Sequence, residues 1–226
     1  MSLQLNESPV TYKEFFGHYH EQMPQLLRDG RKPMTTADIM RRRLEVAESD
    51  AQLRSAWLDN YFDTSDAVLY HPDGNIKIVR DAQPLVTINT QSDIRAGALV
   101  ITSDAYRSLS GPEFARQDLI TDTPLSKAEA RASPIWQALA GDDHSLLNAY
   151  IDLAFSDAKR RFGYTENMGV YLGLAQATPT LRAWFVSRIG DGSVLRGVND
   201  LDYLSARLIG VVPEAPARAA GQDPQP

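Results

Sequence analysis

Two short segments of the sequence combine residue types that can bind a metal ion or transfer a proton. His18 and His20 are separated by one residue, and Asp142, Asp143 and His144 are consecutive. Imidazoles and carboxylates are common ligands of divalent cations, and both groups act as general acids or bases. We therefore take His18 and His20 as candidate metal ligands, and Asp142, Asp143 and His144 as candidate catalytic residues.

The surroundings of both segments also favour structural roles. Residues 12–27 follow a helical pattern, and side chains two positions apart on a helix diverge, so His18 and His20 would form only a surface pair. Asp142 and Asp143 precede a long amphipathic segment, where carboxylates cap the free N–H groups of a helix and complement its dipole. Capping is the interpretation we prefer, and a metal site is the alternative.

A third set of candidates suits binding rather than catalysis. Arg182, Trp184 and Arg188 belong to an alternating segment, residues 180–189, that is typical of a strand. An indole flanked by guanidinium groups can stack against a base or a peptide. Burial of Trp184 in the core is the competing interpretation, because tryptophan is highly buried on average. The tip of a predicted hairpin at 70–75 could belong to the same binding face.

Signatures of several enzyme classes are missing from the sequence. It contains neither of the glycine-rich phosphate-binding patterns, GxGxxG and GxxxxGK[ST], nor the GxSxG turn of the α/β-hydrolases. The chain has no cysteine, which excludes disulfides, thiolate nucleophiles and cysteine-ligated metals. These features favour a binding role, and they predict no cofactor unless the metal-dependent alternative holds.

The charge balance bears on the kind of partner. The net charge of −6 disfavours nucleic acid, because non-specific binding to phosphates requires many cations. Two basic clusters remain, at 41–43 and 159–161, and we expect both to be exposed helix surface. If folding placed them on one face, a contact with phosphate or RNA would become arguable.

The elements that must position these residues are clearest at 133–163. Ser133 and Pro134 suit the start of a short helix, and Gly141 suits its end. A long amphipathic helix then follows from Asp142 or Asp143 and ends at Gly163, with cations in its last turn. This helical pair shows that the chain has a packed core, but it identifies no chemistry.

Further helices are predicted upstream. The pattern over 12–27 predicts a helix that Pro24 kinks or ends near Gln22. Cap residues predict other helices that begin at Thr35 or Thr36, at Ser49 or Asp50, at Ser103 or Asp104, and at Ser126 with Glu129 as a capping box.

Strands are predicted in two regions. The first contains a hairpin around Asp73-Gly74, a strand at 85–88 and a buried strand at 97–102. The second is a C-terminal antiparallel meander with strands at 168–175, 180–189 and 207–213 and a hairpin turn at Asp191-Gly192.

These elements define an α+β fold class: N-terminal helices, antiparallel β hairpin and meander segments, and a central helical pair packed on the sheet. The expected organisation is a single globular domain over 1–212, with a weak boundary near 118–132, and a disordered tail at 213–226. The N-terminus does not resemble a signal peptide and no segment is apolar enough to span a membrane, so we expect a soluble, cytoplasmic protein.

The preferred function is a non-catalytic binding or assembly module, with a protein partner or self-association through aromatic strand faces or helix faces. The alternative is a metal-dependent hydrolase or nuclease that uses the histidines and aspartates named above. That alternative requires residues distant in sequence to converge on one ion.

Overall fold

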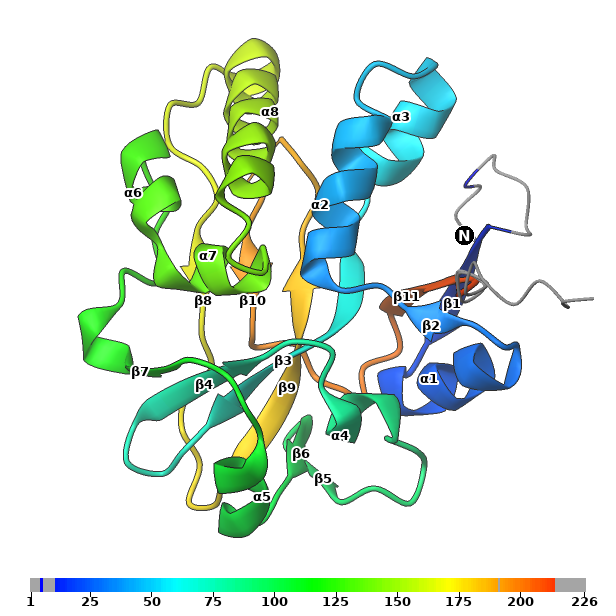
Figure 1. Ribbon diagram of the computed structural model, residues 1–226, viewed down its shortest axis with the longest axis vertical. Helices are drawn as coiled ribbons and strands as arrows, with labels where there is room; N and C mark the ends of the chain where they lie inside the picture. Colours follow the sequence, from blue (N-terminus) through cyan, green and yellow to red (C-terminus); the bar gives the residue numbers. More distant parts are fainter. Residues whose placement is uncertain (1–4, 6–10, 191, 214–226) are drawn as a thin grey trace, which may run out of the picture.

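The protein is built around a central β-sheet (Figure 1). The computed structural model describes residues 5, 11–190 and 192–213. Within these residues the sheet has 11 strands, and its main path runs β1-β11-β3-β9-β10-β8. The strands are β1 (Tyr12–Gly17), β2 (Lys32–Pro33), β3 (Phe62–Tyr70), β4 (Asn75–Val79), β5 (Ile94–Arg95), β6 (Ala98–Val100), β7 (Glu113–Ala115), β8 (Val170–Tyr171), β9 (Thr180–Val186), β10 (Leu195–Arg196) and β11 (Ala206–Val211).

Helices flank the sheet. They are α1 (Tyr19–Arg28), α2 (Thr36–Glu45), α3 (Ala51–Leu58), α4 (Gln83–Val86), α5 (Ser103–Ser108), α6 (Lys127–Ala132), α7 (Pro134–Leu139) and α8 (His144–Phe162), with a short 3-10 helix, η1 (Arg116–Asp118). Figure 1 shows α2, α3, α7 and α8 gathered at one end and α1, α4 and α5 at the other. The predicted α+β class is confirmed.

Strand β3 lies at the centre of the sheet and contributes side chains to a hydrophobic core on each of its two faces. It pairs with β9 and β4 in antiparallel fashion and with β11 in parallel fashion. Its side chains alternate between faces: Val68 and Tyr70 join the core under α2, α3, α7 and α8, whereas Ala67 and Leu69 join the core under α1, α4 and α5. The N-terminal, central and C-terminal strands therefore form one sheet.

Capping residues in the sequence predicted the start of most helices correctly. Thr35 and Asp38 form a capping box at α2, Asp50 caps α3, and Ser126 with Glu129 forms the capping box of α6. The helical pair is as predicted, since Ser133 caps α7 and Asp143 caps α8. Gly163 ends α8 with a φ of 74°, a left-handed conformation that glycine adopts without a steric penalty. At α5 the cap is Thr102 rather than Ser103 or Asp104.

The prediction of one helix over 12–27 was wrong. Residues 12–17 form β1, which pairs antiparallel with β11, Tyr12 opposite Val211. This pairing spans almost the whole chain, and the hydrogen bonds and burial that it gains outweigh the local helical pattern. The helix begins only at Tyr19, and it continues through Pro24 to Arg28 rather than ending near Gln22.

The predicted strand at 85–88 is also a helix. Pro84 lies in the first turn of α4, where its missing N–H breaks no helical hydrogen bond. Leu85 and Ile88, three residues apart, are both buried in the core beneath α1. The spacing of these apolar residues, which resembled that of a strand, is therefore that of one helical turn and the residues after it.

The C-terminal strands are only partly a meander. Strands β9 and β10 pair antiparallel as predicted, but β11 lies between β1 and β3 and runs parallel to β3. Residue Asp191 of the predicted turn lies outside the described residues, as does the predicted disordered tail from residue 214 onward. None of the helices in the described part of the chain is both long and apolar enough to span a bilayer.

Candidate functional site

The candidate catalytic residues lie at the start of α8. Asp142 adopts a left-handed conformation in the turn before the helix, with a φ of 57°. The Asp143 carboxylate accepts hydrogen bonds from the Ser145 hydroxyl, at 2.6 Å, and from the Leu146 N–H, at 3.0 Å. These contacts lower the pKa of Asp143, the hydroxyl contact most. The geometry is that of a helix cap, and His144 is the first residue of the helix.

The two candidate metal ligands, His18 and His20, lie close together, but both contact a loop. His18 caps α1 with an extended backbone, so its ring is not splayed away from His20 as a continuous helix would require; the ring centroids are 5.5 Å apart. Each Nδ1 contacts a carbonyl of the loop after β10, that of Asp202 at 2.5 Å and that of Leu201 at 3.0 Å. No group of three or more His, Asp or Glu side chains that could hold a metal occurs among the described residues.

The three candidate binding residues are separated. Trp184 is fully buried in the core under α8. Arg182 donates to the carbonyls of Val198 and Asn199 and forms an ion pair with Asp200 at 2.6 Å. Arg188 is exposed and lines the groove described below. Of the three, only Arg188 therefore lines the groove.

The basic cluster at 41–43 does not form an exposed surface as a unit. Arg43 is fully buried, where its guanidinium donates to the carbonyls of Trp57 and Asn60 and to the Tyr150 hydroxyl. Our expectation that this cluster is wholly solvated was therefore wrong. The carbonyls at the end of α3 accept the hydrogen bonds of Arg43, which satisfies a cation in the core.

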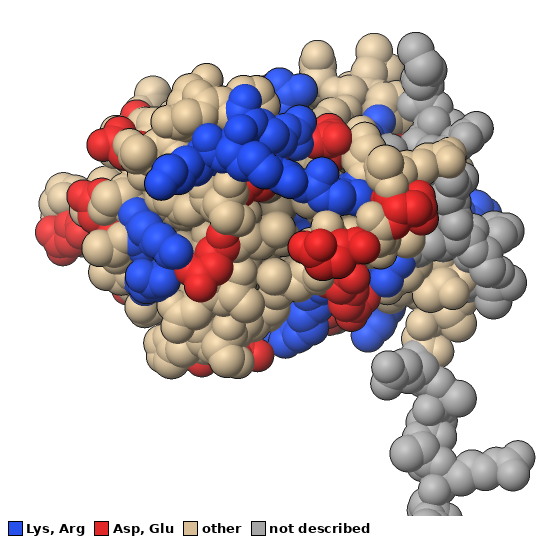
Figure 2. All heavy atoms as spheres, turned by 90° about the horizontal axis from the view of Figure 1, so that it is seen from above, with Lys and Arg blue, Asp and Glu red and all other residues tan. Residues whose placement is uncertain are grey.

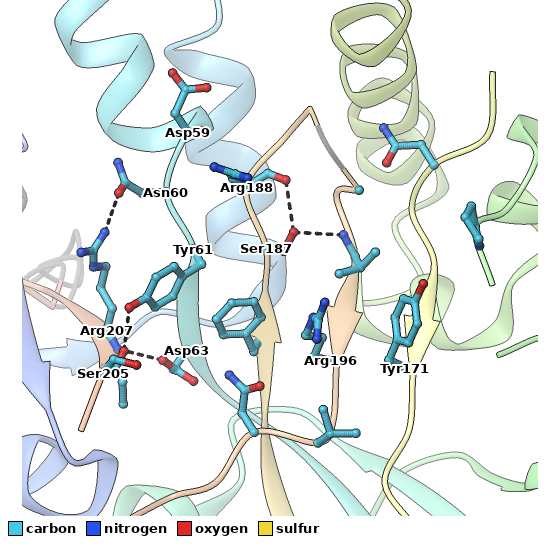
Figure 3. Close-up of a pocket in the computed structure, with 18 of the residues that line it drawn as sticks. Asp59, Asn60, Tyr61, Asp63, Tyr171, Ser187, Arg188, Arg196, Ser205 and Arg207 are labelled. Carbon is cyan, nitrogen blue, oxygen red and sulfur yellow. Dashed lines mark hydrogen bonds between the residues drawn. The ribbon is translucent and has the colours of Figure 1, made fainter. Parts of the chain in front are cut away.

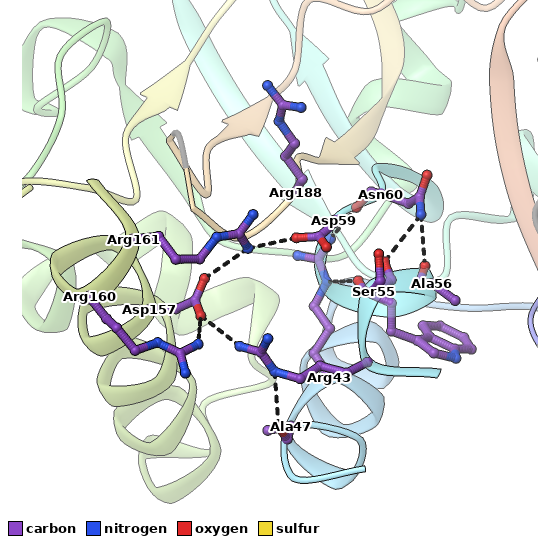
Figure 4. Close-up of polar contacts among 12 residues, drawn as sticks. Arg43, Ala47, Ser55, Ala56, Asp59, Asn60, Asp157, Arg160, Arg161 and Arg188 are labelled. Atoms are coloured by element: carbon purple, nitrogen blue, oxygen red, sulfur yellow. Dashed lines mark hydrogen bonds and ion pairs between the residues drawn. The ribbon is translucent and has the colours of Figure 1, made fainter. Parts of the chain in front are cut away.

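Two residues of the basic cluster at 159–161, Arg160 and Arg161, contact a buried acid, Asp157 (Figure 4). The Asp157 carboxylate forms ion pairs with Arg54 of α3 and with Arg160 and Arg161 of its own helix. Burial raises its pKa, but the hydrogen bonds and charges of these arginines outweigh burial and leave the pKa lowered. The cluster fastens α3 to α8.

A groove of about 1200 Å³ opens on the surface of the protein. It is lined by segments that follow α3 and α8 and by residues of β3, β8, β9, β10 and β11. Its walls are rich in aromatic, amide and guanidinium groups: Tyr61, Tyr164, Tyr171, Phe185, Tyr203, Asn60, Asn167, Asn199, Arg188, Arg196 and Arg207.

Strand alternation creates the floor of this groove. Val170, Val186 and Leu195 are buried in the core under α8, so their neighbours Tyr171, Phe185 and Arg196 face the opposite side of the sheet. These neighbours are also in register, with Arg196 opposite both Phe185 and Tyr171, and the row continues as Phe185 opposite Asp63. Side chains from four strands therefore form one row across the sheet.

Aromatic and cationic groups stack along this row (Figure 3). Tyr61 stacks on Phe185 with ring centroids 5.0 Å apart, and the Arg207 guanidinium lies 4.8 Å from the Tyr61 ring. On the other side, Arg196 lies 5.3 Å from the ring of Tyr171. Contacts of this kind restrain the side chains before a ligand arrives, which lowers the entropy lost on binding.

One wall of the groove is fixed by buried hydrogen bonds. The Tyr61 hydroxyl donates to the Ser205 carbonyl at 2.8 Å, and the Asp63 carboxylate accepts from the Arg207 N–H at 2.8 Å. The Arg207 guanidinium is in turn held by Glu14, at 2.9 Å, and by the Asn60 side chain, at 2.6 Å. The start of β11 is therefore rigidly attached to the beginning of β3.

Asp63 has an unusual proton affinity for a carboxyl group. Burial raises its pKa to about 7, although hydrogen bonds from Arg207 and Asn199 oppose the effect. The group is almost completely buried at the base of the groove. Its charge consequently changes near neutral pH, and with it the strength of the contacts that hold the groove wall.

Comparison with known proteins bears on the fold. No family model and no curated protein matches the chain. One solved structure, described as "Accommodation of massive sequence variation in Nanoarchaeota by the C-type lectin fold", superposes on 88% of this chain and 97% of that chain with a TM-score of 0.65. The two sequences are 14% identical, so the match establishes a similar fold and nothing further.

Sequence reasoning identified only Arg188 among the groove residues. The others lie at Pro124 and in five longer segments, at 59–63, 163–171, 185–188, 192–200 and 203–207, and only tertiary structure unites them. One usable signal was the alternation in the C-terminal strands, since a strand with one buried face must expose the other. That argument applied to Tyr171 and Arg196 would have pointed to the groove.

Proposed function

We propose that this protein is a non-catalytic binding module that holds a segment of a polypeptide partner in the groove between the end of α3 and strand β8. The observation that carries the proposal is the row of Phe185, Arg196 and Tyr171, with Tyr61 stacked on Phe185, on the sheet face opposite the core under α8. The groove is larger than most small-molecule pockets, which span roughly 300–1,000 Å³, so an extended ligand suits it better.

The composition of the groove supports this proposal. Tyr, Arg and Trp dominate the energetics of protein interfaces, and binding surfaces of antibodies are rich in Tyr, Ser, Gly and Asn. Tyrosine supplies a large contact area with little rotamer entropy to lose, and asparagine and serine supply adaptable hydrogen bonds. The lining of the groove combines the same types, including Tyr203 and Ser205 at one end and Tyr164 at the other.

The comparison is compatible with a binding role. The similar structure concerns a C-type lectin fold that accommodates massive sequence variation in Nanoarchaeota. A fold that accommodates sequence variation is compatible with a binding module, and this compatibility supports the proposal.

Selection of peptides tests the proposal. A displayed library of random dodecapeptides is selected on the protein, and the enriched peptides are titrated by fluorescence anisotropy. We expect binding that Tyr171→Ala weakens at least about tenfold, because truncation of a central aromatic anchor costs more than about 1.4 kcal/mol. Val198→Trp, which fills the groove without removing a contact, should also weaken binding.

A matched control separates groove binding from general stickiness. Leu27 is 38% exposed on α1 and does not line the groove, so Leu27→Ala should leave affinity unchanged. Thermal melting of each variant establishes that it is folded. Enriched peptides that bind equally well to the wild type, Tyr171→Ala and Val198→Trp would overturn the assignment of the groove.

A further inference from the structure

The charges around the groove are not balanced at its centre. Asp59 is paired with Arg161 at 2.7 Å, and Asp200 is paired with Arg182 at 2.6 Å, so these two carboxylates are already neutralised. Asp63, at the base, has a pKa of about 7 and carries only part of its charge near neutral pH. The acids close to the floor therefore contribute little negative potential.

Arg196 lies in the middle of the floor with its charge available. Its side chain is exposed, and within the described residues its guanidinium makes a contact with the Tyr171 ring but no ion pair. The flat guanidinium stacked on an aromatic ring leaves its edge free for the two parallel hydrogen bonds that a carboxylate accepts. An arginine in this arrangement can bind an anion.

Further cations extend from Arg196 toward the end of α8. Arg188 is exposed on the rim of the groove, and Lys159, Arg160 and Arg161 lie in the last turn of α8. Figure 4 shows Arg161 pointing toward Asp59, and Arg188 above this pair with its guanidinium directed away from it. Figure 2, which views this end of the molecule, shows Lys and Arg side chains gathered in a continuous band. Because Arg160 and Arg161 also pair with Asp157 and Asp59, the excess of positive charge on this side of the groove is modest.

We propose that the partner segment is acidic: a carboxylate of the partner binds the Arg196 guanidinium, and an adjacent aromatic or aliphatic side chain packs on Phe185 and Tyr171. This inference rests on the proposed function, because it specifies the partner of the same groove. A flanking acidic residue of the segment continues toward Arg188 and the end of α8. The net charge of the partner segment is negative.

One lining residue opposes this charge pattern. Glu166 is exposed on the loop after α8 and makes no ion pair within the described structure. It repels an acidic segment from the part of the groove that it lines. Glu166 is also a useful control, because its neutralisation must act on an acidic ligand in the opposite direction from neutralisation of Arg196.

A peptide suits this arrangement better than a nucleic acid. The net charge of the chain is −6, and binding to a phosphate backbone requires neutralisation of many closely spaced charges. The arginines at the end of α8 share their charge with Asp157 and Asp59, which leaves a modest excess. Binding of a single carboxylate to a stacked guanidinium requires much less positive charge.

Two labelled peptides of matched size provide the test. Fluorescein-labelled GEFEGEFEG and GKFKGKFKG are titrated against the full chain by anisotropy, with a twelve-nucleotide poly-dT as a third probe. We expect the acidic peptide to bind at least about tenfold more tightly than the basic one. Its affinity should decrease with added salt, because partly exposed charges are screened.

Variants of two residues then locate the contact. Arg196→Gln should weaken the acidic peptide about tenfold. Arg196→Lys, which keeps the charge but loses the stack on Tyr171 and the paired hydrogen bonds, should weaken it by a smaller factor. Glu166→Gln should strengthen it. Tighter binding of the basic peptide or of poly-dT, or an Arg196→Gln variant that binds the acidic peptide as the wild type does, would overturn the inference.

The outcomes distinguish this inference from the proposed function. If library-selected peptides depend on Tyr171 but carry no acidic residues and ignore Arg196→Gln, the groove binds polypeptide and the inference is wrong. If no selected peptide depends on Tyr171, the proposed function fails first. Binding of the acidic peptide that survives Tyr171→Ala but not Arg160→Gln would place the contact on α8 outside the groove and contradict both.

Discussion

Asp63 makes the stability of this protein depend on pH in a direction opposite to that of ordinary paired carboxylates. Burial raises its pKa from 3.8 to about 7 in the folded protein. The folded state therefore binds this proton more tightly than the unfolded state does, and stability falls as pH rises between these two values. The full difference corresponds to about 4 kcal/mol, of which about 3 kcal/mol is lost between pH 5 and pH 8.

The Asp63→Asn variant isolates this contribution. An amide oxygen can still accept the hydrogen bond from the Arg207 N–H, and the amide has no charge to bury. The wild type and Asp63→Asn are unfolded in urea at pH 5, 6, 7 and 8, and the free energies of unfolding are compared at each pH. We expect the variant to gain stability relative to the wild type by about 3 kcal/mol from pH 5 to pH 8. A difference that is constant across this range would refute the reasoning.

Asp66 is a second buried aspartate of β3 whose pKa burial also raises, and it provides a comparison in which the hydrogen bonds differ. Its two oxygens accept hydrogen bonds from two backbone groups, the N–H of Thr36 at 2.7 Å and the N–H of Asp81 at 2.9 Å. An asparagine offers a single acceptor, so Asp66→Asn leaves one buried N–H without a partner. We expect this variant to be less stable than the wild type at pH 5 by about 1–3 kcal/mol.

Three further substitutions test other parts of the structure. Asp157→Asn removes the carboxylate around which three arginines gather and should lower stability by about 2–3 kcal/mol, with a loss that shrinks in high salt. Arg43→Lys cannot supply the separate donors that reach two carbonyls and a tyrosine hydroxyl, and should cost about 2–4 kcal/mol. Gly197→Ala places a Cβ 2.7 Å from Val68 and 2.8 Å from the Tyr70 hydroxyl, and should cost about 1–3 kcal/mol. Urea unfolding at pH 7 measures all three, and an unchanged midpoint in any of them would contradict the contact concerned.

The features that depend on neighbouring residues could be predicted from the sequence. A cap requires a side chain and an N–H two or three positions apart, so Asp50, Ser126 and Asp143 were recognisable as caps. The hairpin of β3 and β4 is local in the same sense, since Gly74 permits the tight turn between them. These interactions stabilise a short segment whatever structure the remainder of the chain adopts.

The features that depend on distant residues could not be predicted in this way. Residues 12–17 become a strand because β11, near the other end of the chain, supplies their hydrogen bonds. Arg43 has the local pattern of an exposed helix residue, and only the end of α3 and Tyr150 of α8 make it a buried one. The groove has the same origin, because its row of side chains requires the pairing of four strands that the sequence separates.

The most direct test of the central claim is a map of where a selected peptide binds. The protein is labelled with 15N, and its amide shifts are recorded with and without a library-selected dodecapeptide. We predict that the largest changes occur at the segments that line the groove, around Asp63, Tyr171, Phe185 and Arg196. Changes confined to other surfaces, such as α1 or the start of α8, would contradict the assignment of the groove as the binding site.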